Sequence, residues 1–133
     1  MGGGPVADAT APDDAAADAV DAALARGNAA YEADDLPAAI TAYEDAVRAL
    51  TPADDARAAD VHENLGIAYW RTGAWRPAIR AFLRVLDGDL GAREQALRLL
   101  VGCLFRDGLP LDGERLLGEY ERRFGPHPEG WSR

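Results

Sequence analysis

Lysine is absent from this 133-residue chain, and all 14 of its basic residues are arginine. A single cysteine, Cys103, excludes an intramolecular disulfide, and its apolar neighbours favour a buried, unreactive thiol. No apolar run approaches the roughly 18 residues that a membrane-spanning helix needs. Residues 1–22 lack the basic start and apolar segment of a signal peptide. We therefore expect a cytoplasmic protein without membrane insertion.

Negative charge is concentrated in the first half of the chain. Residues 1–60 contain 13 acidic residues and 3 arginines, for a net charge of −10, whereas residues 61–133 contain 10 and 11, for +1. An excess of negative charge repels phosphate backbones and anionic lipid headgroups. The sequence therefore predicts that neither nucleic acid nor a membrane surface is the partner.

Groups that support catalysis or metal binding are few. The two histidines, His62 and His127, lie far apart in the sequence, and no glycine-rich phosphate loop is present. We interpret His62 as a surface residue and His127 as part of a loop. The acidic pairs Asp13–Asp14, Asp34–Asp35 and Asp54–Asp55 fall at expected helix ends, where aspartate caps backbone N–H groups. The sequence predicts no enzymatic activity, no cofactor and no metal site.

Helical periodicity covers most of the chain. Residues 1–12 are rich in Gly, Pro, Ala and Asp and predict a disordered tail. From Asp13, apolar residues recur at three- and four-residue spacing until Asp34–Asp35, and Pro37 then suits the first turn of a second helix. Thr51 begins a capping pattern, with an acid three residues later, ahead of a third helix. Two helices joined by so short a turn form an antiparallel hairpin.

The hairpin pattern repeats along the chain. Residues of the first hairpin recur 39 positions later, and a third copy follows 35 or 36 positions after the second. The matched sets are Gly27, Ala39, Tyr43 and Ala46, then Gly66, Ala78, Phe82 and Val85, then Gly102, Gly113, Leu117 and Tyr120.

This repeat resembles the tetratricopeptide repeat, whose motif of about 34 residues has Leu-Gly and an aromatic on its first helix and Ala, aromatic, Ala on its second. The second unit matches best, with Leu65, Gly66, Tyr69, Ala78 and Phe82. The resemblance covers about residues 20–126. It implies an all-α, right-handed superhelical solenoid of three antiparallel helix hairpins. The repeats would span about 20–53, 59–92 and 95–126, in a domain of residues 13–126 with a C-terminal extension at 127–133.

Gly66 lies within a helical pattern, where glycine costs about 0.5–1 kcal/mol relative to alanine. We interpret it as a point of close approach, met by Ala78 from the second helix, with Tyr69 and Phe82 filling the space beyond. Gly73 instead ends the helix. The corresponding structural residues are Gly27, Ala39, Tyr43, Gly66, Tyr69, Ala78, Phe82 and Gly102.

The resemblance also implies a concave groove lined by the first helices of the repeats. Its candidate residues lie one, four and five positions after each motif glycine, with Asn64 in addition. They are Asn28, Tyr31, Glu32, Asn64, Ile67, Trp70, Arg71, Cys103, Arg106 and Asp107. This mixture of aromatic residues and arginine is typical of interaction surfaces. The alternative is that Tyr31 and Trp70 only cover neighbouring repeats.

One branch of the family grips the C-terminal carboxylate of chaperones with lysines, arginines and asparagines. Asn28 and Asn64 match its two asparagines. Leu24, Ala96 and Leu100 occupy the positions of its basic residues, so the sequence does not favour chaperone-tail binding.

A second candidate surface lies on the fourth expected helix. Arg76, Arg80 and Arg84 are spaced by four and share one face. This ridge is either a solvated face or a surface for an acidic partner, such as the acidic half of a second copy. At the other end of the array, Trp131 either folds back onto the last hairpin or anchors another chain.

We therefore predict a non-catalytic adaptor or scaffold that binds a peptide segment or a protein surface in its groove. The alternative is a self-assembling structural subunit, a homo-oligomer or filament, that associates through the ends of the array.

Overall fold

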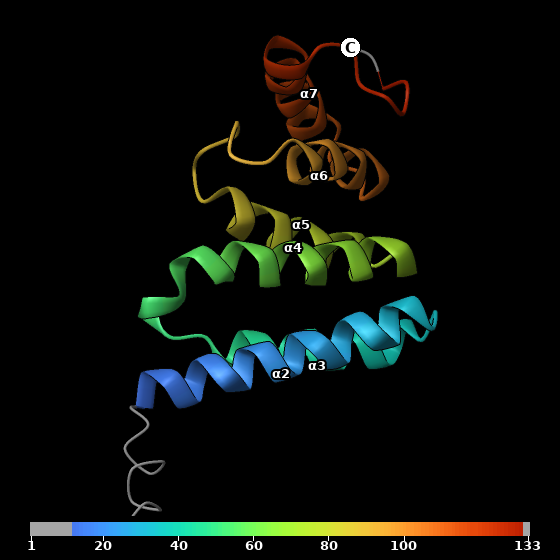
Figure 1. Cartoon of the computed structure of the whole chain (residues 1–133). Coiled ribbons are helices and arrows are strands. Elements are labelled where there is room, and N and C mark those ends of the chain that lie inside the picture. The colour runs from blue at the N-terminus through green and yellow to red at the C-terminus, as the bar shows by residue number, and fades with distance from the viewer. Residues whose placement is uncertain (1–11, 132–133) are drawn as a thin grey trace, which may run out of the picture. The chain divides into compact units, whose positions relative to one another are not determined.

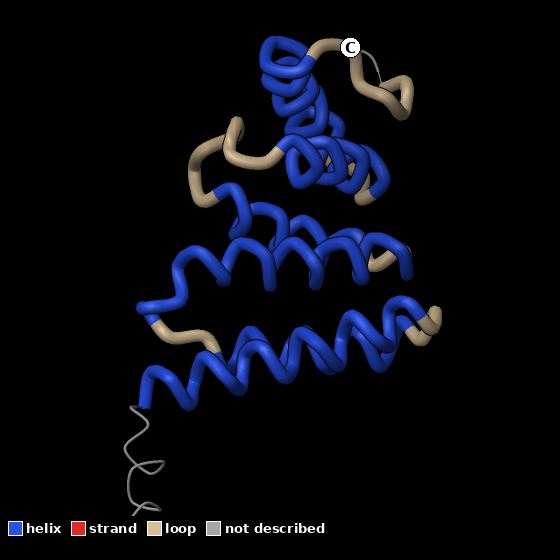
Figure 2. Tube along the Cα trace, viewed as in Figure 1, coloured by secondary structure: helices blue, strands red, loops and turns tan. Residues whose placement is uncertain are grey.

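The computed structural model describes residues 12–131, so the predicted tail lies almost wholly outside the described residues. All regular elements in this part of the chain are helical, as the sequence predicts (Figure 2). They are α2 (Pro12–Glu32), α3 (Leu36–Ala49), the 3-10 turn η1 (Pro52–Asp54), α4 (Asp55–Thr72), α5 (Trp75–Leu86), α6 (Glu94–Arg106) and α7 (Pro110–Phe124) (Figure 1).

The chain divides into two compact units, residues 1–58 and 59–133, with the boundary inside α4. The first unit contains the hairpin of α2 and α3, whose buried residues are mainly alanine, with Val20 and Tyr43 as the larger side chains. The Tyr43 hydroxyl donates to Asn28 Oδ1 at 2.6 Å and so joins the two helices. Arg57, in the first turn of α4, adds an ion pair to Asp21 of α2 at 2.8 Å.

One turn geometry closes the first helix of all three hairpins. Asp34, Gly73 and Gly108 have φ values of 61°, 78° and 76°. At each, the residue donates its N–H to the carbonyl three positions back, and the next residue donates to the carbonyl five positions back. This is the Schellman ending of a helix, and it recurs at intervals of 39 residues (34 to 73) and 35 residues (73 to 108).

The recurring turn corrects the third sequence alignment by one residue. The turn that ends α6 lies 35 residues after the turn that ends α4. The residue of α6 that corresponds to Gly66 is therefore Val101 and not Gly102. Gly102 instead faces the C-terminal residues, and a Cβ there would lie 3.1 Å from Glu129 Oε1. The corrected correspondence joins Tyr31 with Trp70 and Phe105, and Glu32 with Arg71 and Arg106.

Close glycine contacts hold the hairpins together, with a different partner from the one predicted. The ring of Phe82, not Ala78, occupies the space beside Gly66, and Tyr43 does the same beside Gly27. The third hairpin reverses the arrangement, because the glycine is Gly113 on its second helix and a Cβ there would lie 2.9 Å from the Phe105 ring.

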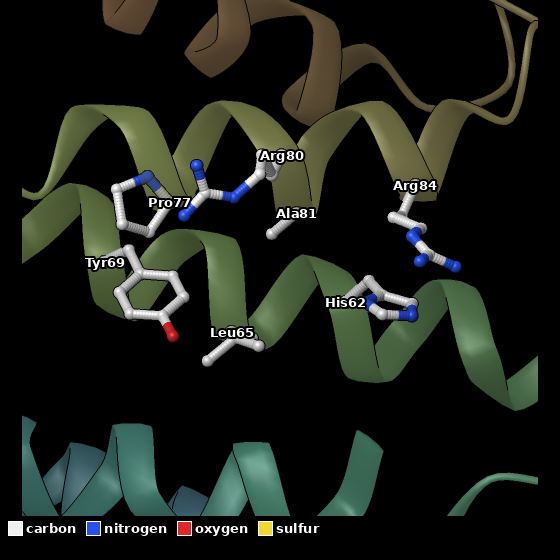
Figure 3. Close-up of a pocket in the computed structure, with 7 residues that line it drawn as sticks. All are labelled: His62, Leu65, Tyr69, Pro77, Arg80, Ala81 and Arg84. Carbon is white, nitrogen blue, oxygen red and sulfur yellow. The ribbon is translucent and has the colours of Figure 1, made fainter. Parts of the chain in front are cut away.

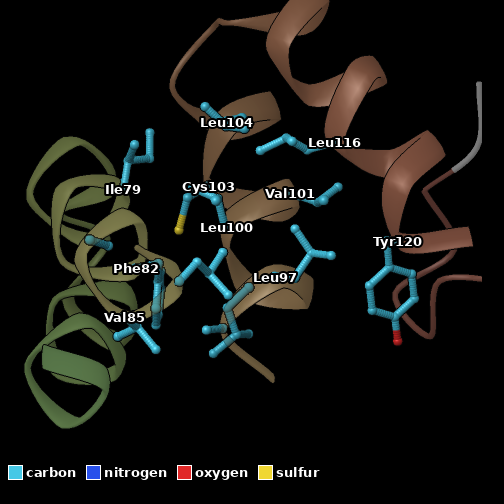
Figure 4. Packing of buried hydrophobic residues seen from close by; sticks show 14 of the residues in the cluster. Ile79, Phe82, Val85, Leu97, Leu100, Val101, Cys103, Leu104, Leu116 and Tyr120 are labelled. Atoms are coloured by element: carbon cyan, nitrogen blue, oxygen red, sulfur yellow. The ribbon is translucent and has the colours of Figure 1, made fainter. Parts of the chain in front are cut away.

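Helix α6 forms the centre of the second unit. Its side chains point both ways (Figure 4): Leu97, Leu100 and Cys103 are fully buried in a cluster that α5 and α7 complete. Helix α6 is apolar on most of its surface, because it packs against α5 on one side and α7 on the other. On α7, Phe124 is 39% exposed, and its ring centre lies 5.3 Å from that of Tyr120.

Two of the acidic pairs cap helices as predicted. Asp35 Oδ1 accepts from the Ala38 N–H at 3.3 Å at the start of α3. Asp54 Oδ2 accepts from the N–H of Thr51 at 2.9 Å and from its hydroxyl at 3.1 Å, and the backbone hydrogen bond lowers the Asp54 pKa. The side chains of Asp13–Asp14 lie outside the described residues.

Candidate binding pockets

Two tryptophans and two arginines converge in the second unit. Trp70 and Arg71 come from the last turn of α4, Trp75 opens α5, and Arg106 ends α6. These four residues line a pocket of about 260 Å³, here called the tryptophan-arginine pocket. The Schellman turn at Gly73 reverses the chain between Trp70 and Trp75, so that both can line the same pocket.

Arg106 is fixed in place at this pocket. Its guanidinium carbon lies 5.4 Å from the centre of the Trp75 ring and 5.3 Å from that of Trp131, distances at which a cation is attracted to a ring face. Its Nη2 also donates to Glu129 Oε2 at 3.0 Å. The guanidinium is therefore oriented before any partner arrives.

The contacts to Arg106 come from a C-terminal strap, residues 127–131. Trp131 stacks on Phe105 with ring centres 4.7 Å apart, so of its two predicted roles the structure has the fold-back onto the last hairpin. His127 lies in a loop, as predicted, but is only 5% exposed. Its Nδ1 accepts from the Glu129 N–H at 3.1 Å, so its Nε2 carries the hydrogen and donates to the Arg98 carbonyl at 2.9 Å.

Of the residues predicted for the groove, Trp70, Arg71 and Arg106 meet at the tryptophan-arginine pocket. Sequence reasoning missed Trp75, because it considered only the first helix of each repeat. Trp75 lies two residues after the turn glycine Gly73, and this position could have indicated that its ring lies near the end of the first helix. Cys103 is fully buried, and burial raises its pKa to about 12, so it is neither a groove residue nor a nucleophile.

The other predicted groove residues have different surroundings. Ile67 is half-buried and packs against the core of the second unit, and Asn64 is half-buried on α4. Asn28, Tyr31 and Glu32 lie at the end of α2 in the first unit. The Asn28 amide oxygen accepts the Tyr43 hydroxyl hydrogen bond inside its own hairpin.

The predicted ridge of arginines is divided by the structure. Arg76 turns to α6, where its Nη2 lies 2.8 Å from Asp107 Oδ2. Arg80 and Arg84 instead border a second pocket, of about 240 Å³, between α4 and α5 (Figure 3). We call it the α4/α5 pocket; it is lined by His62, Leu65, Tyr69, Pro77, Arg80, Ala81 and Arg84.

His62 forms part of the wall of the α4/α5 pocket rather than an open surface. Its side chain is half-buried and faces Arg84 across the pocket (Figure 3). Burial lowers the pKa of His62, and the positive charge of Arg84 lowers it further. The imidazole is therefore biased toward its neutral form.

The first unit has a counterpart of the α4/α5 pocket. It has a volume of about 440 Å³ and is lined by Arg26, Ala30, Pro37, Ala38, Thr41, Ala42 and Asp45. Six of these seven positions lie 39 residues before members of the α4/α5 pocket. The structure thus repeats a surface site as well as a turn. In the first copy, opposite charges meet across it, because Arg26 Nη2 lies 3.6 Å from Asp45 Oδ2.

Within residues 12–131, no three His, Cys, Asp or Glu side chains gather where they can hold a metal ion. The helices described here include none with the length and apolarity that crossing a membrane requires. The chain matches neither a model of a known protein family nor a curated protein. The tetratricopeptide resemblance therefore rests on the residues of the chain itself.

Proposed function

We propose that the chain is a non-catalytic protein-interaction module of tetratricopeptide type, acting in the cytoplasm as an adaptor or scaffold. In this proposal the three hairpins stack as a right-handed superhelical solenoid, and a peptide segment or protein surface of the partner binds in its groove. The convergence of Trp70, Trp75, Arg71 and Arg106 on one pocket is the observation that carries the proposal.

These residue types suit the centre of a binding surface. Tryptophan and arginine are enriched among the residues that contribute most to binding, since rings bury large areas and guanidinium groups pair with carboxylates. Arg106 is held between Trp75 and Trp131, so binding restricts it less than it would restrict a mobile side chain. A partner that presents an apolar side chain next to a carboxylate fits this chemistry.

The internal repeats support the tetratricopeptide assignment. Gly27 with Tyr43, and Gly66 with Phe82, make the same glycine-to-ring contact 39 residues apart. The same pair of Schellman hydrogen bonds ends the first helix of all three hairpins, as expected of a repeated unit. Repeats of this kind stack against their neighbours to bury a continuous core.

Affinity capture tests the proposal. The tagged protein is used to recover partners from its native lysate, beside a Trp70→Ala/Arg71→Ala variant. A Leu111→Ala/Arg115→Ala variant is the control, because both residues are exposed on α7 away from the pocket. One partner that is retained by the wild type and the control, and lost from the pocket variant at unchanged helicity, supports the proposal. Equal recovery by all three proteins contradicts it.

A self-assembling subunit is the second candidate, and the exposed apolar residues of the last helix favour it. Leu111 is 81% exposed and Phe124 is 39% exposed. Mass measured by light scattering over a range of concentrations tests this candidate. Oligomers that a Leu111→Asp/Phe124→Asp variant disrupts, and a Leu83→Asp variant on α5 does not, support it. A monomeric mass at every concentration excludes it.

A further inference from the structure

We propose that the α4/α5 pocket is a second binding site, specific for acidic peptide segments in which carboxylates flank an apolar side chain. The site is separate from the tryptophan-arginine pocket and shares none of its lining residues. The α4/α5 pocket would give the proposed interaction module a preference for acidic partners, and this preference can be tested separately.

Arg80 and Arg84 carry positive charges that no carboxylate balances within the described residues. Seven other arginines of the second unit do form ion pairs there: Arg76, Arg93, Arg98, Arg106, Arg115, Arg122 and Arg123. An arginine fork is suited to bidentate binding of carboxylate. The two unbalanced forks therefore provide a binding site for two carboxylates.

The geometry of the pocket suits two carboxylates on either side of an apolar side chain. Arg80 and Arg84 are one helical turn apart, about 6 Å along α5, and Ala81 lies between them (Figure 3). Leu65 of α4 and Ala81 line the pocket but are already buried, at 7% and 6% exposure, whereas Tyr69 and Pro77 are half-buried. An apolar side chain of a partner can cover Tyr69 and Pro77 while its neighbouring carboxylates reach the guanidinium groups. Excluding water from this contact strengthens the ion pairs.

The counterpart pocket of the first unit shows that the fold does not require these arginines. At the positions 39 residues earlier, Thr41 corresponds to Arg80 and Asp45 to Arg84. The same hairpin surface is built there with an internal ion pair between Arg26 and Asp45. The cationic character is therefore a property of the second copy alone, which is expected of a binding site and not of a packing constraint.

A peptide fits this surface better than a polyphosphate does. The net charge of the chain is −9, which opposes the approach of nucleic acid. Covering the half-buried Tyr69 and Pro77 with a hydrocarbon side chain removes apolar area from water and so stabilises the complex. An acidic peptide with a central leucine supplies both features.

His62 reports directly on the occupancy of the pocket. A carboxylate bound beside Arg84 offsets the positive charge that lowers the His62 pKa and itself favours the charged imidazole, so peptide binding raises this pKa. The chain has only two histidines, and the ring nitrogens of His127 are hydrogen-bonded in the C-terminal strap, so it serves as the internal reference.

The test is binding of a fluorescein-labelled EELEE peptide to the full chain, followed by anisotropy at low salt. Neutral QQLQQ and a single-stranded oligonucleotide of equal charge are the comparison probes. The key variant is Arg80→Thr/Arg84→Asp, which gives the second pocket the residues of the first. An Arg48→Asp/Arg115→Thr variant makes the same change in net charge at two exposed positions.

We expect the wild type and the charge-matched control to bind EELEE with similar affinity. The pocket variant is expected to bind at least tenfold more weakly at unchanged helicity, with QQLQQ bound by none of the proteins. Raised salt weakens the EELEE complex. In NMR titrations, EELEE shifts the His62 ring signals and raises the His62 pKa. The ring signals of His127 do not shift.

Four outcomes overturn the inference. Equal EELEE binding by the pocket variant places the site elsewhere, and equal affinity for the oligonucleotide removes the selectivity for peptides. Dimerisation that only the Arg80→Thr/Arg84→Asp variant abolishes assigns the pocket to a second copy. The Trp70→Ala/Arg71→Ala variant separates this test from that of the proposed function, because its EELEE binding should be intact. If that variant alone loses EELEE, the acidic site is the tryptophan-arginine pocket, and the proposed function stands without this inference.

Discussion

The ring of Phe82 occupies the space that a side chain at position 66 would need. A Cβ on Gly66 would lie 2.7 Å from Phe82 Cε1, and the Phe82 side chain is fully buried. Glycine in a helix costs about 0.5–1 kcal/mol relative to alanine, whereas burying an aromatic side chain stabilises a fold by about 1.5–3 kcal/mol. The burial of the Phe82 ring therefore offsets the energetic cost of having glycine at position 66.

Replacing Gly66 with alanine should destabilise the second unit by about 1–3 kcal/mol, because the added methyl forces the buried ring to move. Chemical denaturation measures the change. Gly91→Ala is the control, since a Cβ there would lie 3.4 Å or more from its neighbours and its φ is not positive. Adding Phe82→Leu to Gly66→Ala should cost less than the sum of the two single changes. Unchanged stability of Gly66→Ala would show that the contact is unimportant.

Asp34 is the one non-glycine residue among the three Schellman turns, with a φ of 61°. A left-handed residue other than glycine carries strain of about 1–2 kcal/mol, and less for aspartate. Asp34→Gly, which copies Gly73 and Gly108, is expected to raise the thermal midpoint. A lower midpoint for Asp34→Gly would contradict the comparison between turns.

Asp35→Ala removes the cap of α3 and is expected to lower the free energy of unfolding by about 1 kcal/mol.

The lowered pKa of His62 predicts a pH dependence of stability. Burial, and then Arg84, disfavour the charged form in the folded chain, so the unfolded chain binds more protons as the pH falls. Folding stability should be fully present above about pH 6.5, the ordinary histidine pKa, and should decrease as the pH falls toward the lower folded value. Denaturation at a series of pH values measures the slope. His62→Gln should flatten it, and an equal slope in that variant would assign the effect to another group.

Sequence reasoning reached the helices and the repeat of the first two hairpins because glycine, aromatic and turn residues are local signals. Asp35 and Asp54 cap as predicted for the same reason. The alignment of the third hairpin was wrong by one residue. It matched Gly102 of α6 with Gly66, whereas the position of the turn makes Val101 the counterpart of Gly66. Residue type alone could not distinguish two adjacent positions in a nearly all-apolar helix.

The binding pockets were less predictable than the helices. Arg76, Arg80 and Arg84 share a helix face, but the sequence cannot show that Asp107, 31 residues beyond Arg76, neutralises only the first of them. His62 was assigned to the surface because the α5 residues that line the same pocket lie 15 to 22 positions further along the chain. These relationships are tertiary and have no periodic signal.

The stack of Trp131 on Phe105 predicts that the C-terminal strap stabilises the second unit. Trp131→Ala should lower the free energy of unfolding, and a double-mutant cycle with Phe105→Leu should give a coupling of about 0.5–1.5 kcal/mol. Thermal unfolding of the four proteins measures this coupling. Glu129→Gln, which leaves the stack in place, serves as the control and should show no coupling to Phe105→Leu. Additive effects of the Phe105 and Trp131 changes would mean that the ring stack does not contribute to stability.

Hydrogen exchange on the complex with the captured partner tests the central claim most directly. Amides are compared with and without partner, and we expect protection at residues 67–76 and 103–107, the segments that form the tryptophan-arginine pocket. The Trp70→Ala/Arg71→Ala variant should show no protection at the same partner concentration. Protection confined to α7, or none in the wild type at saturating partner, would contradict the proposal that this chain binds its partner through that pocket.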